Sequence, residues 1–203
     1  MLNIVTKRID GLPVTTIDNL YSTNECDLIF EELNFLHSKL KSPEDVNGPG
    51  TSYRDGIALK HNKGLFLDSC YSDRSISNIL QVNRKIFSAE ARNLLEKEST
   101  FFRYISLSNR DTTKIHYFSN GDYYSSHNDA SLITVISWFY NSPKSFFGGD
   151  LIFENLVSVE CLNNRVVVFP SCLYHEVEKV SIPSDLNGRF GRYSISQFLS
   201  IGL

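Results

Sequence analysis

The chain has 203 residues, of which 41% are hydrophobic and 21% charged, and it is long enough to bury the core of a single domain spanning residues 1–203. Its formal net charge of -3 excludes the broad basic surface that nucleic-acid-binding proteins usually carry. The sequence contains no apolar run of the ~18 residues that a membrane span needs, and its first residues lack the pattern of a secretion signal. We therefore expect a cytoplasmic protein with neither a nucleic acid nor a membrane as partner.

The four cysteines are widely separated and form no C-x-x-C pair. Such spacing is unlike the dense frameworks that cross-link small secreted domains. We expect reduced, mostly buried thiols at Cys26, Cys70, Cys161 and Cys172.

The first half of the chain, residues 1–99, is predicted to be mostly helical. Ser22 to Glu25 has the spacing of a capping box, and apolar residues then recur at helical intervals from Cys26 to Leu40. Two further helical patterns follow, at Ile76–Phe87 and around Ala89–Leu95. These helices are expected to support the second half of the chain.

Between the first two helical patterns, the segment from Lys41 to about Gly64 is rich in Ser, Pro, Gly and Asn and has no apolar period. A loop of this length inside a compact domain is uncommon and is often functional. We interpret it as a lid over a binding site.

From Thr100 onward the apolar pattern becomes strand-like, and turn signals separate the strands. Residues 100–203 are therefore expected to form an all-β sandwich or barrel, with the helices on its outer face. The predicted strands are Phe102–Leu107, Thr113–Phe118, Leu132–Tyr140, Leu151–Phe153, Val166–Phe169, Glu176–Val180 and Tyr193–Leu199.

Three residues in this half are candidate metal ligands. On extended backbone, His127 and Asp129 project to the same face, so both could bind one ion. His175 follows a β-rich run, and antiparallel pairing would bring it beside them. Two imidazoles and one carboxylate form the triad that suits iron(II) oxygenases, because it leaves adjacent coordination positions open.

An oxo-acid that chelates such a metal needs its distal carboxylate fixed. A guanidinium does this better than an ammonium, because its planar donors match a carboxylate in two parallel hydrogen bonds. Arg192, at the start of the last predicted strand, is the candidate, and Ser194 on the same face is a further donor. Arg189 is the alternative if the strand register differs.

Several motifs together resemble the prolyl-4-hydroxylase-like branch of the iron(II)/2-oxoglutarate dioxygenases. The resemblance is strong over about Lys114 to Leu199 and loose in the amino-terminal helices. The interval from His175 to Arg192 is longer than is usual for the family, which is why Arg189 stays an alternative. The motifs are Tyr117–Asp129, Phe147–Phe153, Val168-Phe169-Pro170 with His175, and Arg192-Tyr193-Ser194.

The resemblance implies an α+β protein whose core is a double-stranded β-helix, or jelly roll, with the three metal ligands at its mouth. It implies iron(II), 2-oxoglutarate as co-substrate, dioxygen, and ascorbate as reductant. It also implies that Arg192 binds the distal carboxylate of 2-oxoglutarate and that the Tyr117 hydroxyl assists; the alternative for Tyr117 is an aromatic residue of the core. Gly148-Gly149 is expected to be a tight turn.

For the reaction, the resemblance implies hydroxylation of an unactivated C–H bond, and Asp129 distinguishes the chain from related halogenases, which have a small residue there. The expected substrate is a prolyl or other amino-acid side chain, free or within a peptide. Tyr124 and Trp138 could line its pocket or simply pack in the core, and three isolated histidines, His37, His61 and His116, are expected to bind no metal.

Two other function classes compete with this interpretation. One is a non-catalytic jelly-roll binding module, against which the retention of all three ligand types argues. The other is a cupin-type metalloenzyme without a keto-acid co-substrate, in which Arg192 would have no co-substrate role.

Overall fold

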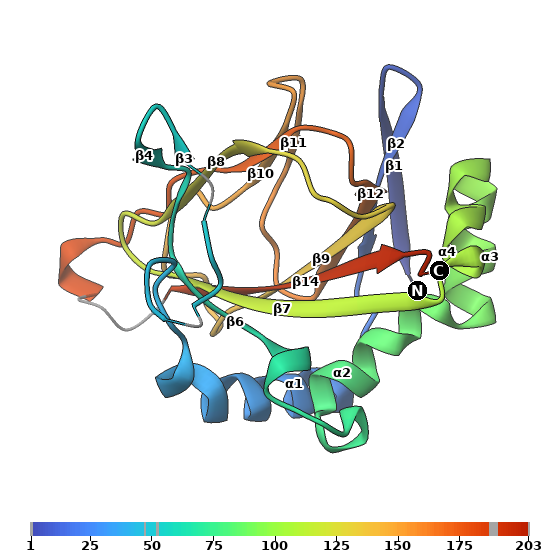
Figure 1. Ribbon diagram of the computed structural model, residues 1–203. Helices are drawn as coiled ribbons and strands as arrows, with labels where there is room; N and C mark the ends of the chain where they lie inside the picture. Colours follow the sequence, from blue (N-terminus) through green and yellow to red (C-terminus); the bar gives the residue numbers. More distant parts are fainter. Residues whose placement is uncertain (1, 47, 52, 187–190, 203) are drawn as a thin grey trace.

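A computed structural model describes residues 2–46, 48–51, 53–186 and 191–202, in which two antiparallel sheets form a double-stranded β-helix with helices against one side (Figure 1). The larger sheet has the order β1-β2-β12-β9-β14-β7-β6 and the smaller one β11-β10-β13-β8-β5. The strands of the larger sheet are β1 (Asn3–Ile9), β2 (Leu12–Asp18), β6 (Lys63–Phe66), β7 (Arg110–Phe118), β9 (Ile133–Phe139), β12 (Arg165–Pro170) and β14 (Arg192–Ser200). Those of the smaller sheet are β5 (Lys60–His61), β8 (Tyr123–His127), β10 (Leu151–Phe153), β11 (Val157–Val159) and β13 (His175–Val177).

The central strands of the larger sheet are buried on both faces, and this explains why apolar residues occur on both faces of β9 and β12. In β9, Ile133, Val135 and Phe139 pack toward the helices. Ile136 and Trp138 alternate with them and pack between the two sheets. The double-stranded β-helix expected from the sequence is therefore confirmed, together with the helical layer on its outer face.

Helix α1 (Thr23–Leu36) begins as predicted. The Ser22 side chain accepts a hydrogen bond from the Glu25 N–H, and the Glu25 carboxylate accepts one from the Ser22 N–H. The helices pack an apolar face on the larger sheet, below it in Figure 1 for α1 and α2. The remaining helical elements are η1 (His37–Lys39), η2 (Leu67–Ser69), η3 (Arg74–Ile76), α2 (Asn78–Asn83), η4 (Arg84–Phe87), α3 (Ala89–Glu98), η5 (Thr100–Arg103), α4 (Tyr104–Leu107) and η6 (Ser184–Leu186).

The prediction that residues 1–99 are mostly helical is wrong at the amino terminus. Strands β1 and β2 form a hairpin that extends the larger sheet beyond β12. Asp10 and Gly11 both have positive φ in its two-residue turn (49° and 80°), as the hairpin signal Asp-Gly requires. The Asp-Gly pair is therefore a local sequence signal for this hairpin, which was not predicted.

The strand predicted at Phe102–Leu107 is also wrong, because η5 and α4 occupy these positions. Phe102 and Ile105 are buried and lie three residues apart, which is a helical interval. The Ser99 hydroxyl accepts a hydrogen bond from the Phe101 N–H and so caps this helical segment.

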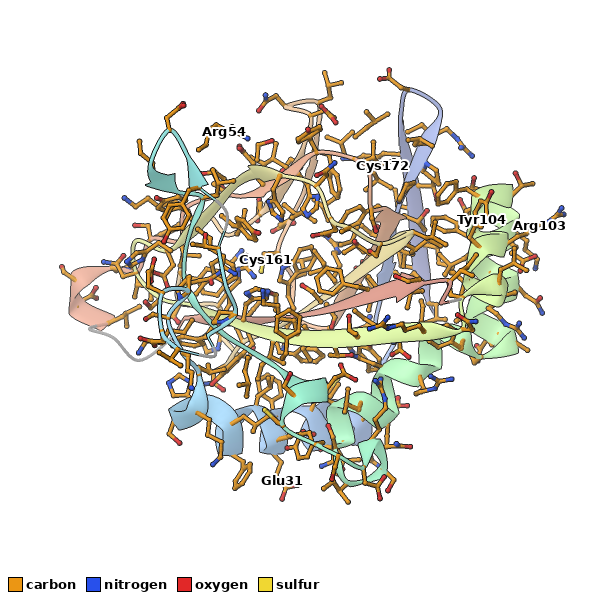
Figure 2. All side chains as sticks on the ribbon, in the orientation of Figure 1. Glu31, Arg54, Arg103, Tyr104, Cys161 and Cys172 are labelled. Carbon is orange, nitrogen blue, oxygen red and sulfur yellow. The ribbon has the colours of Figure 1, made fainter. Side chains whose placement is uncertain are left out.

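The predicted lid segment, Lys41 to Gly64, contains more regular structure than expected. It includes β3 (Tyr53–Arg54) and β4 (Ile57–Ala58), which pair with each other, and β5, which extends the smaller sheet. Arg54, labelled in Figure 2, donates a hydrogen bond of 3.2 Å to the Ser126 carbonyl on β8. The segment therefore lies beside the strand that carries His127.

All four cysteines are free, as expected, but only Cys161 is fully buried, whereas Cys70 and Cys172 are exposed. Within the described residues, none of the helices has the length and apolar character needed to cross a membrane.

Candidate metal centre

His127, Asp129 and His175 converge at one end of the space between the sheets. His127 ends β8 and His175 begins β13, and these two residues are partners in the antiparallel register. One ligand atom from each of the three side chains lies within 4.8 Å of the others. The His127 Nε2–Asp129 Oδ1 distance is 3.9 Å and the His175 Nε2–Asp129 Oδ2 distance is 3.5 Å. The structure thus brings the three predicted ligands together.

Both imidazoles present the same nitrogen to the centre. His127 Nδ1 lies 2.9 Å from the Ser125 carbonyl, and His175 Nδ1 lies 3.0 Å from the Leu173 carbonyl. A carbonyl only accepts, so each Nδ1 carries the proton and each Nε2 is left with a free lone pair. Burial, together with the neighbouring His175, lowers the pKa of His127 to about 3. The neutral imidazole, which is the form that binds metals, is therefore favoured.

Asp129 is held in place from behind. The Thr134 hydroxyl donates a 2.7 Å hydrogen bond to Asp129 Oδ2 and lies 2.8 Å from the Ser171 hydroxyl. The Asp129 N–H donates to the Ser171 carbonyl at 3.0 Å. Contacts of this kind orient a ligating carboxylate and leave its other oxygen available.

Arg192 lies in the same cavity and is completely buried. Its Nη2 donates to the Gly149 carbonyl at 2.8 Å, its guanidinium lies 4.3 Å from the Phe118 ring centroid, and its Nε and Nη1 have no hydrogen-bond partner among the described residues. Burial lowers the pKa of Arg192, but an arginine stays charged at neutral pH. A buried charge with unpaired donors is costly unless a ligand supplies acceptors.

Gly149 has a role that the sequence did not indicate. Gly148 and Gly149, where a tight turn was predicted, both have positive φ, 70° and 77°, but no backbone hydrogen bond closes a turn at these described residues. A Cβ at Gly149 would lie only 2.7 Å from Arg192 Nε. The absence of a side chain there makes room for the guanidinium.

The cavity joins the metal ligands to Arg192. Ser194 lines it from the same face of β14 as Arg192, as predicted, and Tyr124 and Trp138 line it as well. The Tyr124 ring stacks on the His127 imidazole with centroids 3.5 Å apart. The other lining residues are Lys114, His116, Phe118, Ile136, Leu151, Val177, Ser196 and Phe198.

Tyr117 does not lie in this cavity. It belongs to β7, where Phe118 faces the cavity, so the alternation of the strand turns Tyr117 toward the helices. Its hydroxyl accepts a 3.0 Å hydrogen bond from the Gly191 N–H, and its ring packs edge-on against His37. Tyr117 is thus partly buried against the core, as in the alternative, and its contact with the co-substrate stays a prediction.

The remaining predictions about histidines and arginines have mixed outcomes. His37, His61 and His116 fall outside the group of possible metal ligands. His116 is nevertheless buried and lines the cavity, which the sequence did not lead us to expect. Because His116 lies two residues from Phe118 on β7, strand alternation places both side chains on the same face, and this could have predicted it. Arg189 lies outside the described residues.

Comparisons with known proteins agree with this geometry. The model of the 2OG-Fe(II) oxygenase superfamily matches residues 113–200. A PKHD-type hydroxylase of Crocosphaera subtropica is 28% identical over 174 residues, covering 82% of this chain and 72% of that protein.

Two solved structures have a similar fold. A Pseudomonas putida prolyl-4-hydroxylase matches with a TM-score of 0.60 at 12% identity, covering 94% of this chain and 93% of its own. A viral collagen prolyl hydroxylase from Paramecium Bursaria Chlorella virus-1 matches with a TM-score of 0.52 at 13% identity, covering 95% of this chain and 98% of its own. The chain is therefore an enzyme similar to the 2OG-Fe(II) oxygenases, and it has a prolyl-4-hydroxylase-like fold.

Proposed function

We propose that the chain hydroxylates an unactivated C–H bond of a prolyl or other amino-acid side chain, free or in a peptide. In this proposal His127, Asp129 and His175 hold iron(II), and Arg192 binds the distal carboxylate of 2-oxoglutarate. The observation that carries the proposal is that one cavity contains both a three-ligand cluster and a buried guanidinium with unpaired donors.

The donor set fits iron(II). Two neutral imidazoles and one carboxylate suit this ion and leave coordination positions for the keto acid and dioxygen. The superfamily whose model matches residues 113–200 is named for iron(II) and 2-oxoglutarate. Ascorbate remains a proposed reductant that keeps the metal in its ferrous state.

Arg192 fits a dicarboxylate. Its free Nε and Nη1 lie on different edges of the guanidinium, and each can donate a charge-assisted hydrogen bond, which is roughly twice as strong as a neutral one. Ser194 and Ser196 line the same cavity from β14 and offer hydroxyl donors. Binding of the co-substrate would thus remove the cost of the two unpaired donors.

The protein's own part in the reaction is to bind, orient and exclude water. The bound iron and 2-oxoglutarate would supply the oxidising chemistry, with succinate and carbon dioxide as co-products. Thr134 orients Asp129, the Ser125 and Leu173 carbonyls orient the imidazoles, and the apolar walls keep bulk water away from the reacting C–H bond.

The substrate class is supported by the relatives. The similar structures are described as prolyl hydroxylases, one of them acting on collagen, and the curated relative is described as a hydroxylase. A carboxylate at position 129 favours hydroxylation over halogenation.

The first experiment is to record the visible absorption spectrum of the anaerobic protein on adding iron(II) and then 2-oxoglutarate. We expect a metal-to-ligand charge-transfer band that requires both additions and is absent from His127→Ala. A well-folded protein without this band would contradict the proposed metal and co-substrate.

A second variant separates this function from that of a cupin-type metalloenzyme. Arg192→Ala should raise the 2-oxoglutarate concentration needed for the band more than tenfold without changing iron affinity, and Arg192→Met should do the same while keeping the side-chain volume. If both variants titrate like the parent protein, the keto-acid assignment to Arg192 is wrong.

A further inference from the structure

Two lysines from opposite sheets meet beside the candidate metal centre. Lys114 lies on β7 in the larger sheet and Lys60 on β5 in the smaller one. Their Nζ atoms lie 2.8 Å and 3.4 Å from the same acceptor, the Pro49 carbonyl. Their exposed fractions are only 8% and 2%. Two lysine side-chain amines are thus held together in the interior.

The pair has little to balance its charge. Among the described residues, neither amine forms an ion pair with a carboxylate; each donates to the Pro49 carbonyl, and the two amines hydrogen-bond to each other. Each ammonium has three donors, and a buried charge without a counter-charge is strongly disfavoured. Burial and the neighbouring amine lower the pKa of Lys60 to about 6, and burial lowers the pKa of Lys114. An anion bound between them would relieve this cost.

One lysine of the pair, Lys114, lines the cavity that contains the metal ligands. Lys114 lines the cavity together with Asp129 and Tyr124. It also packs on the Phe66 ring, with Nζ 4.6 Å from the centroid. A more open groove lined by Phe66, Arg110 and Thr112 shares Asp129 and Phe198 with the cavity. Lys114 therefore lies on the wall of the cavity, and the groove adjoins this cavity at Asp129 and Phe198.

The pair is separate from the proposed co-substrate anchor. On β7, Phe118 is paired with Arg192 and Lys114 with Ser196, four residues further along the ladder. At about 3.3 Å per residue, the two backbone positions are roughly 13 Å apart. A carboxylate at Arg192 and an anion at the lysine pair are consequently different groups.

We infer that Lys114 and Lys60 form a cationic subsite that binds a carboxylate of the hydroxylated substrate. The inference rests on the proposed function and narrows it: the substrate would carry a free carboxylate close to the C–H bond that reacts. That carboxylate could be the α-carboxylate of an amino acid or the side-chain carboxylate of an acidic residue in a peptide. Both present the same chemistry to the two amines.

The test observes the amines directly and does not require turnover. Protein labelled with carbon-13 in its lysines is titrated with acetate, the simplest carboxylate, and with uncharged acetamide, and the ε-carbon resonances are followed by NMR. Lys114→Met and Lys60→Met assign the two resonances. We expect acetate but not acetamide to shift both, and each variant to weaken acetate binding at least tenfold at the remaining lysine. Lys63→Met, at an exposed position on neighbouring β6, is the matched control and should leave the titration unchanged.

The same titration is repeated with zinc(II) and 2-oxoglutarate present. Persistence of the acetate shifts supports a substrate subsite. Loss of those shifts, with 2-oxoglutarate itself moving the lysine resonances, would assign the amines to the co-substrate and overturn the inference. Equal effects of acetate and acetamide, or no effect of either, would also overturn it, since the lysines would then only hold the segment around Pro49.

Two further probes identify the source of the carboxylate. N-acetyl-L-proline carries only an α-carboxylate, and the α-methylamide of N-acetyl-L-glutamate carries only a side-chain carboxylate. The probe that binds more tightly identifies the kind of carboxylate, provided that its affinity falls at least tenfold in Lys114→Met. If its affinity is unchanged in this variant, the result contradicts the inference. Failure of the iron and 2-oxoglutarate band in parent protein whose lysines still bind acetate would reject the proposed function and not the subsite.

Discussion

At Gly149, the absence of a side chain leaves room for the guanidinium of Arg192, the candidate co-substrate anchor. Gly149→Ala would place a Cβ 2.7 Å from Arg192 Nε at a φ of 77°. We expect the 2-oxoglutarate requirement to rise at least tenfold and stability to fall by about 1–2 kcal/mol, the cost of left-handed backbone in a residue with a Cβ. Titration of the charge-transfer band and urea unfolding measure the two effects.

Gly11→Ala is the control for Gly149→Ala. Gly11 has nearly the same φ, 80°, but a Cβ there has no neighbour within 4 Å. It should therefore reproduce the loss of stability without the change in 2-oxoglutarate titration. If the two variants require the same 2-oxoglutarate concentration for the band, the effect of Gly149→Ala does not come from contact with Arg192.

Thr134 is expected to act on the metal through Asp129. Thr134→Val removes the hydroxyl that donates to Asp129 Oδ2, and loss of such a contact typically lowers metal affinity 10- to 100-fold. Competition with a chromophoric chelator measures the affinity. Thr113→Val is the matched control, because the buried Thr113 hydroxyl has no partner within the described parts of the chain. An unchanged affinity in Thr134→Val would show that Asp129 is positioned without it.

At the scale of elements, an ion pair joins the amino-terminal hairpin to the jelly roll. Arg165 on β12 donates to both Asp18 oxygens on β2, at 2.6 Å and 3.0 Å, and the two residues are register partners. The hydrogen bonds from Arg165 lower the pKa of Asp18. A lowered pKa means that the contribution to stability is present above the unfolded pKa of about 3.9 and is lost as the pH falls through the folded value.

Asp18→Asn should therefore destabilise the protein by about 1–2 kcal/mol at pH 7 and by much less near pH 3. Urea unfolding at both pH values provides the comparison. The control is Asp27→Asn, at an exposed position on α1, which should change stability little at either pH. A loss for Asp18→Asn that is the same at pH 3 and pH 7 would show that the charge is not the cause.

For the whole molecule, binding of iron(II) and 2-oxoglutarate at the candidate metal centre should stabilise the fold, because ligands that bind only the native state shift the unfolding equilibrium toward it. At 100 times the dissociation constant this amounts to about 2.7 kcal/mol, or roughly 5–10 °C in Tm for a chain of this size. We expect iron(II) under anaerobic conditions to raise Tm, 2-oxoglutarate to raise it further, and a chelator to reverse both. A comparable rise in His127→Ala would mean that the ion binds elsewhere.

Sequence patterns by themselves predicted the all-β second half, the capped first helix and the three candidate metal ligands. Period-two alternation and the short His127–Asp129 spacing are local properties, and the match of residues 113–200 to the 2OG-Fe(II) oxygenase superfamily agrees with them. The hairpin of β1 and β2 was also encoded locally, in the turn signal Asp10-Gly11, although it was not predicted.

Only the tertiary structure decided which neighbours share the cavity. Tyr117 and Phe118 differ by one position, and the β7–β14 register sends Phe118 to Arg192 and Tyr117 to the helices. Likewise, Lys60 and Lys114 are 54 positions apart, and the Pro49 carbonyl at which they meet lies in a third segment. Sequence periodicity predicts on which face of a strand a side chain lies. Which side chains of the two sheets then contact each other depends on packing between segments that are distant in the chain.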